Sequence, residues 1–260
     1  MLGILHIIVS VFIIQAGGYK KLILSKDYNL HELPPSDGPL LVEASINLSN
    51  ILEVLEKQQL ISLETSLRLY WKDSRVKAVE EYLEGVDSIG AYVTLNPVLA
   101  ETIWMPDIFI DKARSVRKPV FFLPPAYLRL YNDSMLKYSA RINYDVACPM
   151  DFRRYPVDQQ TCQIKFESFG HSSSQFLLRW RNRSESNINQ NISLAEFRFS
   201  VVLSDGYSTE SYDVAYPGLS IRIILDREVR PKNCLKITQN RFSHIFSPRI
   251  MSQYGWLNGK

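Results

Sequence analysis

The sequence predicts an all-β fold, a β-sandwich, from three observations. Apolar and polar residues alternate along many short segments, which is the pattern of strands with one buried face. Clusters of turn-forming residues, such as Asn132-Asp133-Ser134 and Ser204-Asp205-Gly206, separate these segments at intervals of about ten residues. The composition, 46% hydrophobic and 22% charged, supplies enough apolar side chains for the core of one large domain or two small ones.

The first segment of the chain is an apolar run from Leu2 to Ile14, which ends in Gln15-Ala16-Gly17-Gly18. This run is too short to span a bilayer comfortably, but it has the length of the hydrophobic region of a secretory signal. We therefore predict a signal peptide at residues 1–18, with a buried apolar strand as the alternative. A polar, proline-rich stretch follows, and we expect residues 19–40 to form a flexible lead-in.

From Leu41 onward, the alternation predicts strands in order along the chain. The clearest of these segments are 66–71, 140–146, 197–201 and 219–225. One segment conflicts with the pattern, because residues 51–57 have the spacing and the propensities of a short helix. The sequence alone leaves that conflict open.

Two cysteines, Cys148 and Cys162, enclose thirteen residues, and a third, Cys234, stands alone. Four Asn-x-Ser sequons agree with secretion, and we expect glycosylation at Asn47, Asn132, Asn182 and Asn191. Because secreted proteins fold in an oxidising compartment, we expect a disulfide between Cys148 and Cys162. This bond would close a small, rigid ring.

The remaining features exclude several classes of function. A net charge of +3 gives no reason to expect nucleic acid as a partner. The chain shows no set of nucleophile, base and acid, no metal motif and no phosphate loop, so we expect neither an enzyme nor a cofactor. Residues 229–260 are basic and aperiodic, and we expect them to be disordered. No segment after the signal is long and apolar enough to predict a transmembrane helix.

Five short motifs identify a family. The disulfide loop, with Phe152 and Tyr155-Pro156-Val157-Asp158 at its centre, resembles the signature loop of the Cys-loop receptors, the pentameric ligand-gated ion channels. The resemblance extends over about residues 41–228, and its other motifs are Tyr70-Trp71-Lys72-Asp73, Trp104-Met105-Pro106-Asp107, Glu167-Ser168-Phe169-Gly170-His171 and Tyr216-Pro217-Gly218-Leu219-Ser220-Ile221.

The wording of two motifs resembles one branch of this family. Cys-Pro-Met-Asp at 148–151 and Phe-Gly after Glu-Ser at 167–170 are similar to the anion-conducting glycine, GABA and arthropod chloride channels. No adjacent pair of cysteines stands near residues 207–216, which disfavours a nicotinic principal subunit.

The resemblance implies a fold and a role for the loop. The fold would be a twisted, immunoglobulin-like β-sandwich of about ten strands, with residues 42–72 as two strands joined by a turn. The disulfide loop would lie at the bottom of the sandwich and pass the binding event to the membrane domain. Its coupling residues would be Phe152, Tyr155, Pro156 and Asp158.

The resemblance also implies a ligand site between neighbouring subunits of a pentamer. Aromatic rings attract a cationic amine, and an arginine on the opposing wall binds a carboxylate. The principal face would use Phe109, Phe169, His171, Tyr207, Tyr212 and Tyr216, with Tyr207 and Tyr212 as competing assignments. The complementary face would use Arg68, Ser139 and Arg141. Without the resemblance, such phenylalanines would be read as core residues, and such arginines as solvated surface residues.

Two departures from the family pattern affect the expected ligand. Ser66 and His171 stand at positions where relatives often carry an aromatic residue, so the aromatic cage is thinner. A histidine titrates near neutral pH and can bind zinc or copper. We therefore consider protons or zinc as agonists beside an amino-acid transmitter or an amine. The alternative is a surface histidine without a role, and we predict no other metal site.

After Glu228, the relatives continue into membrane helices, whereas this sequence continues into the basic tail. We therefore expect the extracellular ligand-binding domain of a chloride-channel subunit, coupled to a pore that this chain does not encode. It would follow the secretory pathway to the outside of the cell or, in a full-length form, to the plasma membrane. The alternatives are a secreted, soluble pentameric ligand-binding protein and a non-functional or dominant-negative truncated isoform.

Overall fold

The computed structural model of the chain describes residues 21–119, 125–182, 185–211 and 214–228. The predicted signal peptide, the basic tail with Cys234, and Tyr212 lie outside these residues. Within the described ranges, no helix has both the length and the apolar character needed to cross a membrane.

Two long strands form the centre of the fold. β2 (Leu40–Leu55) pairs antiparallel with β3 (Leu60–Lys72), and a 3-10 turn, η2 (Glu56–Gln58), joins them. Gln59 reverses the chain in the left-handed region, with φ of 53°. The helical propensity at 51–57 therefore gives way to strand pairing, as the family resemblance implied, because cross-strand packing outweighs local preference.

The larger sheet has nine strands. Its main path follows the order β12, β2, β3, β10, β9, β6 and β5, while β13 pairs with β2 and β8 pairs with β10. The strands other than β2 and β3 are β5 (Glu84–Asp87), β6 (Gly90–Leu95), β8 (Ala113–Arg117), β9 (Ala126–Tyr131), β10 (Met135–Ala147), β12 (Phe176–Trp180) and β13 (Asn187–Ile188).

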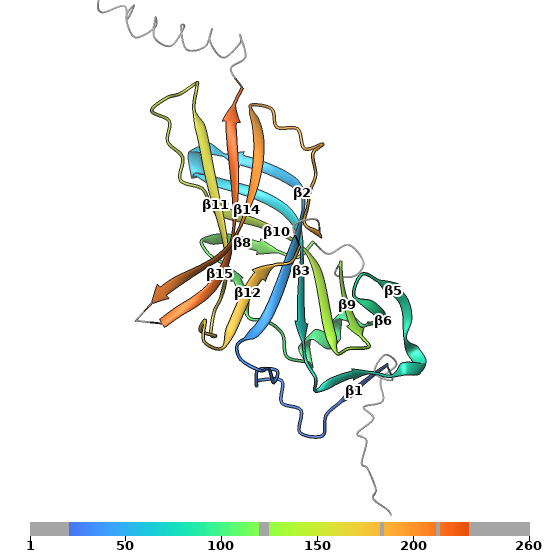
Figure 1. The fold of residues 1–260 in the computed structure, drawn as a ribbon. Coiled ribbons are helices and arrows are strands. Elements are labelled where there is room, and N and C mark those ends of the chain that lie inside the picture. Colours follow the sequence, from blue (N-terminus) through green and yellow to red (C-terminus); the bar gives the residue numbers. More distant parts are fainter. Residues whose placement is uncertain (1–20, 120–124, 183–184, 212–213, 229–260) are drawn as a thin grey trace, which may run out of the picture.

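A second, four-stranded sheet forms the other layer of the sandwich. Its order is β14, β15, β11 and β7, and Figure 1 shows β14 and β15, in orange and red, beside β11. The bounds are β7 (Ile108–Ile110), β11 (Gln159–Ser168), β14 (Phe197–Ser211) and β15 (Val214–Arg227). Two further short 3-10 turns are η3 (Glu80–Tyr82), which precedes β5, and η4 (Pro97–Glu101), which lies between β6 of the larger sheet and β7 of the smaller one.

Apolar side chains from both sheets meet in one core. The ring of Phe166 on β11 packs edge-on against Tyr144 of β10 and Trp180 of β12, with centroid distances of 6.5 and 6.1 Å. The buried Trp180 indole donates a hydrogen bond to the Ser204 carbonyl of β14 at 3.1 Å. These contacts join the two sheets, and the predicted all-β sandwich is confirmed.

The Cys148–Cys162 disulfide is present, and both cysteines are buried. It links the segment after β10 to β11, so the loop between them is closed at its base. The Tyr155–Pro156 peptide bond within the loop is cis.

Two predictions differ from the structure. The lead-in is ordered from residue 21, because β1 (Leu22–Leu24) pairs with β4 (Val76–Ala78) and the Tyr28 hydroxyl accepts a hydrogen bond from the Trp104 amide at 2.7 Å. The turn predicted at 204–206 is instead a register shift inside β14. A bulge accommodates this Asp-Gly pair, so the strand continues without reversing.

Candidate functional site

The outer face of the larger sheet carries the residues predicted for the complementary wall. Side chains alternate along each strand, so Leu67 and Leu69 of β3 point into the sandwich while Arg68 points outward. Arg68 lies directly opposite Ser139 of β10. Directly opposite residues share a face, so the structure brings these two predicted residues together.

Arg68 lies in a row of outward-facing residues that crosses four strands. Ser45 of β2 and Ser139 flank Arg68, and Tyr127 of β9 lies opposite Ser139. Arg141 belongs to the next row, opposite Ser66. Tyr127 was not predicted as a site residue, because only the register of β9 against β10 places it in the row of Arg68.

Arg68 has no ion pair within the part of the chain that the structure describes. Its Nη1 donates one hydrogen bond, to the main-chain carbonyl of Glu185 at 3.3 Å. By contrast, Arg141 pairs with Glu64 at 2.6 Å, while Arg129 and Lys137 pair with Asp87 at 3.2 and 3.6 Å.

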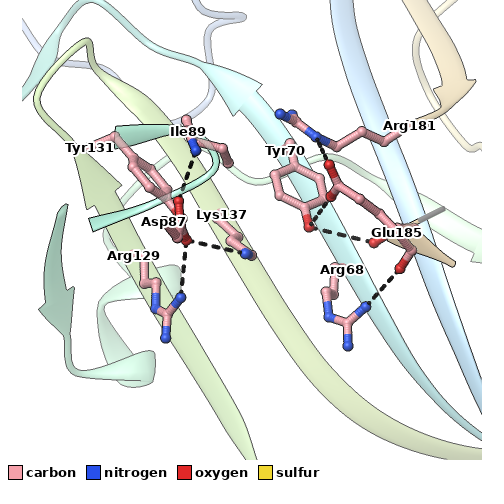
Figure 2. A network of polar contacts seen from close by, with 10 residues as sticks. Arg68, Tyr70, Asp87, Ile89, Arg129, Tyr131, Lys137, Arg181 and Glu185 are labelled. Carbon is pink, nitrogen blue, oxygen red and sulfur yellow. Dashed lines mark hydrogen bonds and ion pairs between the residues drawn. The ribbon is translucent and has the colours of Figure 1, made fainter. Parts of the chain in front are cut away.

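Asp87 is the carboxylate partner of both Arg129 and Lys137 on this face. Its carboxylate also accepts hydrogen bonds from the Tyr131 hydroxyl at 2.6 Å and from the Ile89 amide at 2.9 Å. Burial alone would raise the pKa of the Asp87 carboxyl, but these hydrogen bonds and the charges of Lys137 and Arg129 hold its pKa below the ordinary value. Figure 2 shows this cluster beside the one that contains Arg68.

A second network fixes the segment that covers Arg68. The Glu185 carboxylate accepts hydrogen bonds from Arg181 Nε at 2.9 Å and from the Tyr70 hydroxyl at 3.2 Å (Figure 2). Glu185 and Arg181 were not predicted as site residues. No local pattern could have indicated them, because Glu185 meets Tyr70 across 115 residues of chain.

Two of the predicted principal-face residues form a pair on the other sheet. Phe109 of β7 and Phe169, just after β11, pack edge-on with ring centroids 5.8 Å apart. Phe169 is 78% exposed, which is unusual for a phenylalanine. Asp107 holds the following turn, since its carboxylate accepts from Ser168 Oγ at 2.9 Å and from the Gly170 amide at 2.6 Å.

His171 is half-buried among aromatic rings. Its imidazole stacks on Phe176 at 6.0 Å and lies 6.2 Å from the ring of Trp104. Within the described ranges, no group of three or more metal-ligating side chains includes it.

Of the three predicted tyrosines, the structure describes the side chain of Tyr216 only. Tyr216 is half-buried on β15, opposite Thr209 of β14. The main chain of Tyr207 pairs with Gly218, but its side chain is outside the described part of the structure, as is all of Tyr212. The choice between these two tyrosines therefore stays a prediction.

The predicted coupling loop divides into an exposed tip and a buried base. Phe152 and Tyr155 are exposed, whereas the side chains of Asp158 and Arg227 are each 1% exposed. Arg227 Nε donates to Asp158 at 2.7 Å, and the same guanidinium pairs with Glu56 at 2.6 Å. Asp158 therefore joins the loop to the end of β15.

The comparisons with known proteins agree on one family. A family model described as the neurotransmitter-gated ion-channel ligand binding domain matches residues 19–229. The chain is 25% identical over 216 residues to a glutamate-gated chloride channel of Drosophila melanogaster, an alignment that covers 83% of this chain and 45% of the relative.

Further relatives are the rho-2 subunits of the gamma-aminobutyric acid receptor from Rattus norvegicus and Homo sapiens. Each is 27% identical over 186 residues, which covers 71% of this chain and 38% of the relative. The chain thus spans less than half the length of these curated relatives.

Proposed function

The chain belongs to the neurotransmitter-gated ion-channel ligand-binding domain family, and we propose that it binds a small amino acid through the carboxylate of that ligand. In this proposal it is the extracellular part of a chloride-channel subunit. The ligand lies between neighbouring subunits of a pentamer, with Arg68 on one wall and Phe109 and Phe169 on the other.

The observation that carries this proposal is the state of Arg68. The cations on the neighbouring positions of this face already have Glu64 or Asp87 as carboxylate partners within the protein itself. Arg68 keeps donors that no carboxylate of the described residues occupies, and Ser139 adds a hydroxyl beside it. A guanidinium next to a hydroxyl is suited to a carboxylate.

The exposed pair of Phe109 and Phe169 favours the assignment of the second wall of the proposed ligand site. Phe109 and Phe169 are exposed and in contact with each other, and such a pair of rings suits a surface that a partner covers. A neighbouring subunit would cover it, and the two rings would face the ammonium group of an amino acid. The match to relatives named as a glutamate-gated chloride channel and gamma-aminobutyric acid receptor subunits favours ligands of this chemistry.

The test uses the full chain secreted from insect cells. Light scattering after size exclusion measures the oligomeric state, and calorimetry measures binding of L-glutamate, γ-aminobutyrate and glycine in separate titrations. We expect a pentamer that binds at least one of the three. Arg68→Ala should weaken that binding about 10- to 100-fold, the usual effect of losing a hydrogen bond to a charged group.

A matched control is Arg179→Ala, which removes an exposed arginine of β12. It should leave binding unchanged. The proposal is contradicted if the pentamer binds none of the three amino acids, or if Arg68→Ala and Arg179→Ala have the same affinity.

A further inference from the structure

We propose that Arg181 and Tyr70 hold the Glu185 carboxylate away from Arg68 and thereby keep Arg68 available for a ligand. This inference rests on the proposed function, because it concerns the same arginine. It assigns Arg181 and Tyr70 as positioning residues that determine how strongly a carboxylate ligand binds.

The segment that carries Glu185 is anchored to β2 at both ends. The Arg181 amide donates to the Ala44 carbonyl at 2.7 Å, and Ser186 Oγ accepts from the Ile46 amide at 3.2 Å. Just beyond it, β13 continues the pairing with β2. Because both ends are fixed, Glu185 is held over the outer face of β2 and β3.

Glu185 is the carboxylate best placed to neutralise Arg68, since its main-chain carbonyl already contacts the guanidinium at 3.3 Å. Its side chain nevertheless turns away. One carboxylate oxygen accepts from Arg181 Nε and the other from the Tyr70 hydroxyl, at 2.9 and 3.2 Å (Figure 2). Both oxygens are therefore engaged by partners other than Arg68.

Arg181 is itself held in position. Its Nη1 donates to Glu43 at 2.8 Å, and its guanidinium lies over the Tyr70 ring, 4.5 Å from the centroid. The carboxylates and the ring therefore fix Arg181 from two sides. Arg181 therefore depends on Glu43 and the Tyr70 ring for the position in which it binds Glu185.

Loss of Arg181 would release a tethered competitor. A carboxylate on the same chain has a millimolar effective concentration at a nearby site. Released Glu185 would pair with Arg68 and occupy the donors that a ligand carboxylate needs. In such a variant, Glu185 would occupy Arg68 and the ligand would have to displace it.

The test measures the chemical availability of Arg68 without any ligand. Phenylglyoxal modifies arginine side chains, and mass spectrometry of peptides gives the rate for Arg68 in the full secreted chain. The variants are Arg181→Gln, Glu185→Gln and the double variant Arg181→Gln/Glu185→Gln. Tyr70→Phe is a milder variant, because it keeps the ring and removes only the hydroxyl donor.

We expect Arg181→Gln to slow the modification of Arg68 about fivefold, the size of a partly exposed ion pair. Tyr70→Phe should slow it less, in the same direction. The double variant should restore the rate to within about twofold of the original chain, because an amide at position 185 carries no charge to pair with Arg68. Arg179→Gln should leave the rate unchanged.

The inference is overturned if Arg181→Gln and Tyr70→Phe both leave the Arg68 rate unchanged. It is also overturned if the double variant remains as slow as Arg181→Gln, since a purely structural effect of Arg181 would not be rescued at residue 185. A failure of amino-acid binding would contradict the proposed function alone, because the modification rate is measured without ligand.

Discussion

At the scale of single residues, the arrangement of charges around Arg68 matters more than the number of cations. Arg141, Arg129 and Lys137 are paired with carboxylates of the same chain, whereas Arg68 bonds only to a main-chain carbonyl within the described residues. A guanidinium that keeps available donors, beside cations that already have carboxylate partners, favours a ligand carboxylate at that position.

His171 makes a second prediction at this scale. Its ring stacks on Phe176 and lies near Trp104, so its packing resembles that of an aromatic residue. His171→Phe should keep the free energy of unfolding within about 0.5 kcal/mol, while His171→Ala should lower it by about 1 kcal/mol through lost ring contacts. Urea unfolding measures both values.

The hypothesis of a proton or zinc response at His171 is tested with the same variants. If His171 only packs, the original chain and His171→Phe should respond alike to pH and to zinc. Their ligand affinities are compared between about pH 5.5 and 7.5, the range in which histidines titrate, and with zinc added. A pH or zinc response that disappears in His171→Phe would show instead that the imidazole itself acts.

At the scale of elements, the β5–β6 hairpin is attached to the outer face through Asp87. Replacing Asp87 by Asn leaves Arg129 and Lys137 without their carboxylate. We expect a loss of about 1–2 kcal/mol in the free energy of unfolding at pH 7, as for other hydrogen bonds to charged groups. Glu101→Gln, at an exposed position of η4, is the control and should change little.

The pH dependence of this loss follows from the lowered pKa of Asp87. A carboxyl whose pKa is lower in the folded state contributes stability above its unfolded pKa, about 3.9. That contribution disappears as the pH falls through the lower folded value. The difference between the original chain and Asp87→Asn should therefore be full at pH 7 and shrink below about pH 4. A difference that is constant from about pH 7 to pH 3 would contradict this role.

The pair of Asp158 and Arg227 fixes the disulfide loop to β15. Both side chains are buried, so Asp158→Asn removes the buried carboxylate partner of Arg227 and leaves its guanidinium with the more exposed Glu56 and Glu196. We expect Asp158→Asn to lower the free energy of unfolding by about 1.5–3 kcal/mol, the value of hydrogen bonds to a charged group. Asp226→Asn, the same change at an exposed neighbour, should cost less than about 1 kcal/mol. Similar losses for both variants would contradict a buried role for this pair.

The elements also show how far the sequence was informative. The family resemblance assigned Arg68 and Arg141 to one wall, and alternation, which repeats every two residues, gave each an outward-facing position on its own strand. Neither signal could place Tyr127 or Glu185 beside Arg68, since the register of β9 and the position of Glu185 over β3 depend on pairing between distant parts of the chain. The Asp-Gly pair at 205–206 was misread as a turn because a bulge uses the same residues.

At the scale of the whole molecule, the proposed pentamer would restrict which sequons can carry glycans. Asn132 and Asn191 are exposed outside the strands, whereas Asn47 lies within β2 between β3 and β13, on the outer face. The serine of the Asn182 sequon is outside the described residues. A glycan on Asn47 would cover the wall that a neighbouring subunit must contact.

We therefore expect Asn132→Gln and Asn191→Gln each to remove one glycan from the secreted chain. Asn47→Gln should remove none, in contrast to the expectation from its sequon alone, because the proposed interface would cover this position. Gel mobility before and after treatment with an N-glycosidase measures this. If Asn47→Gln removes a glycan from a secreted pentamer, the outer face around Asn47 lies outside the subunit interface.

The measurement that tests the central claim most directly compares two ligands that differ only in a carboxylate. γ-Aminobutyrate and n-butylamine are titrated separately into the full chain and into Arg68→Ala. We predict that the original chain binds γ-aminobutyrate at least about tenfold more tightly, because one charged hydrogen bond is worth that much or more. Arg68→Ala should abolish this preference. Equal affinity for both ligands in the original chain, or a preference that survives in Arg68→Ala, would contradict the assignment of Arg68 as the carboxylate-binding residue.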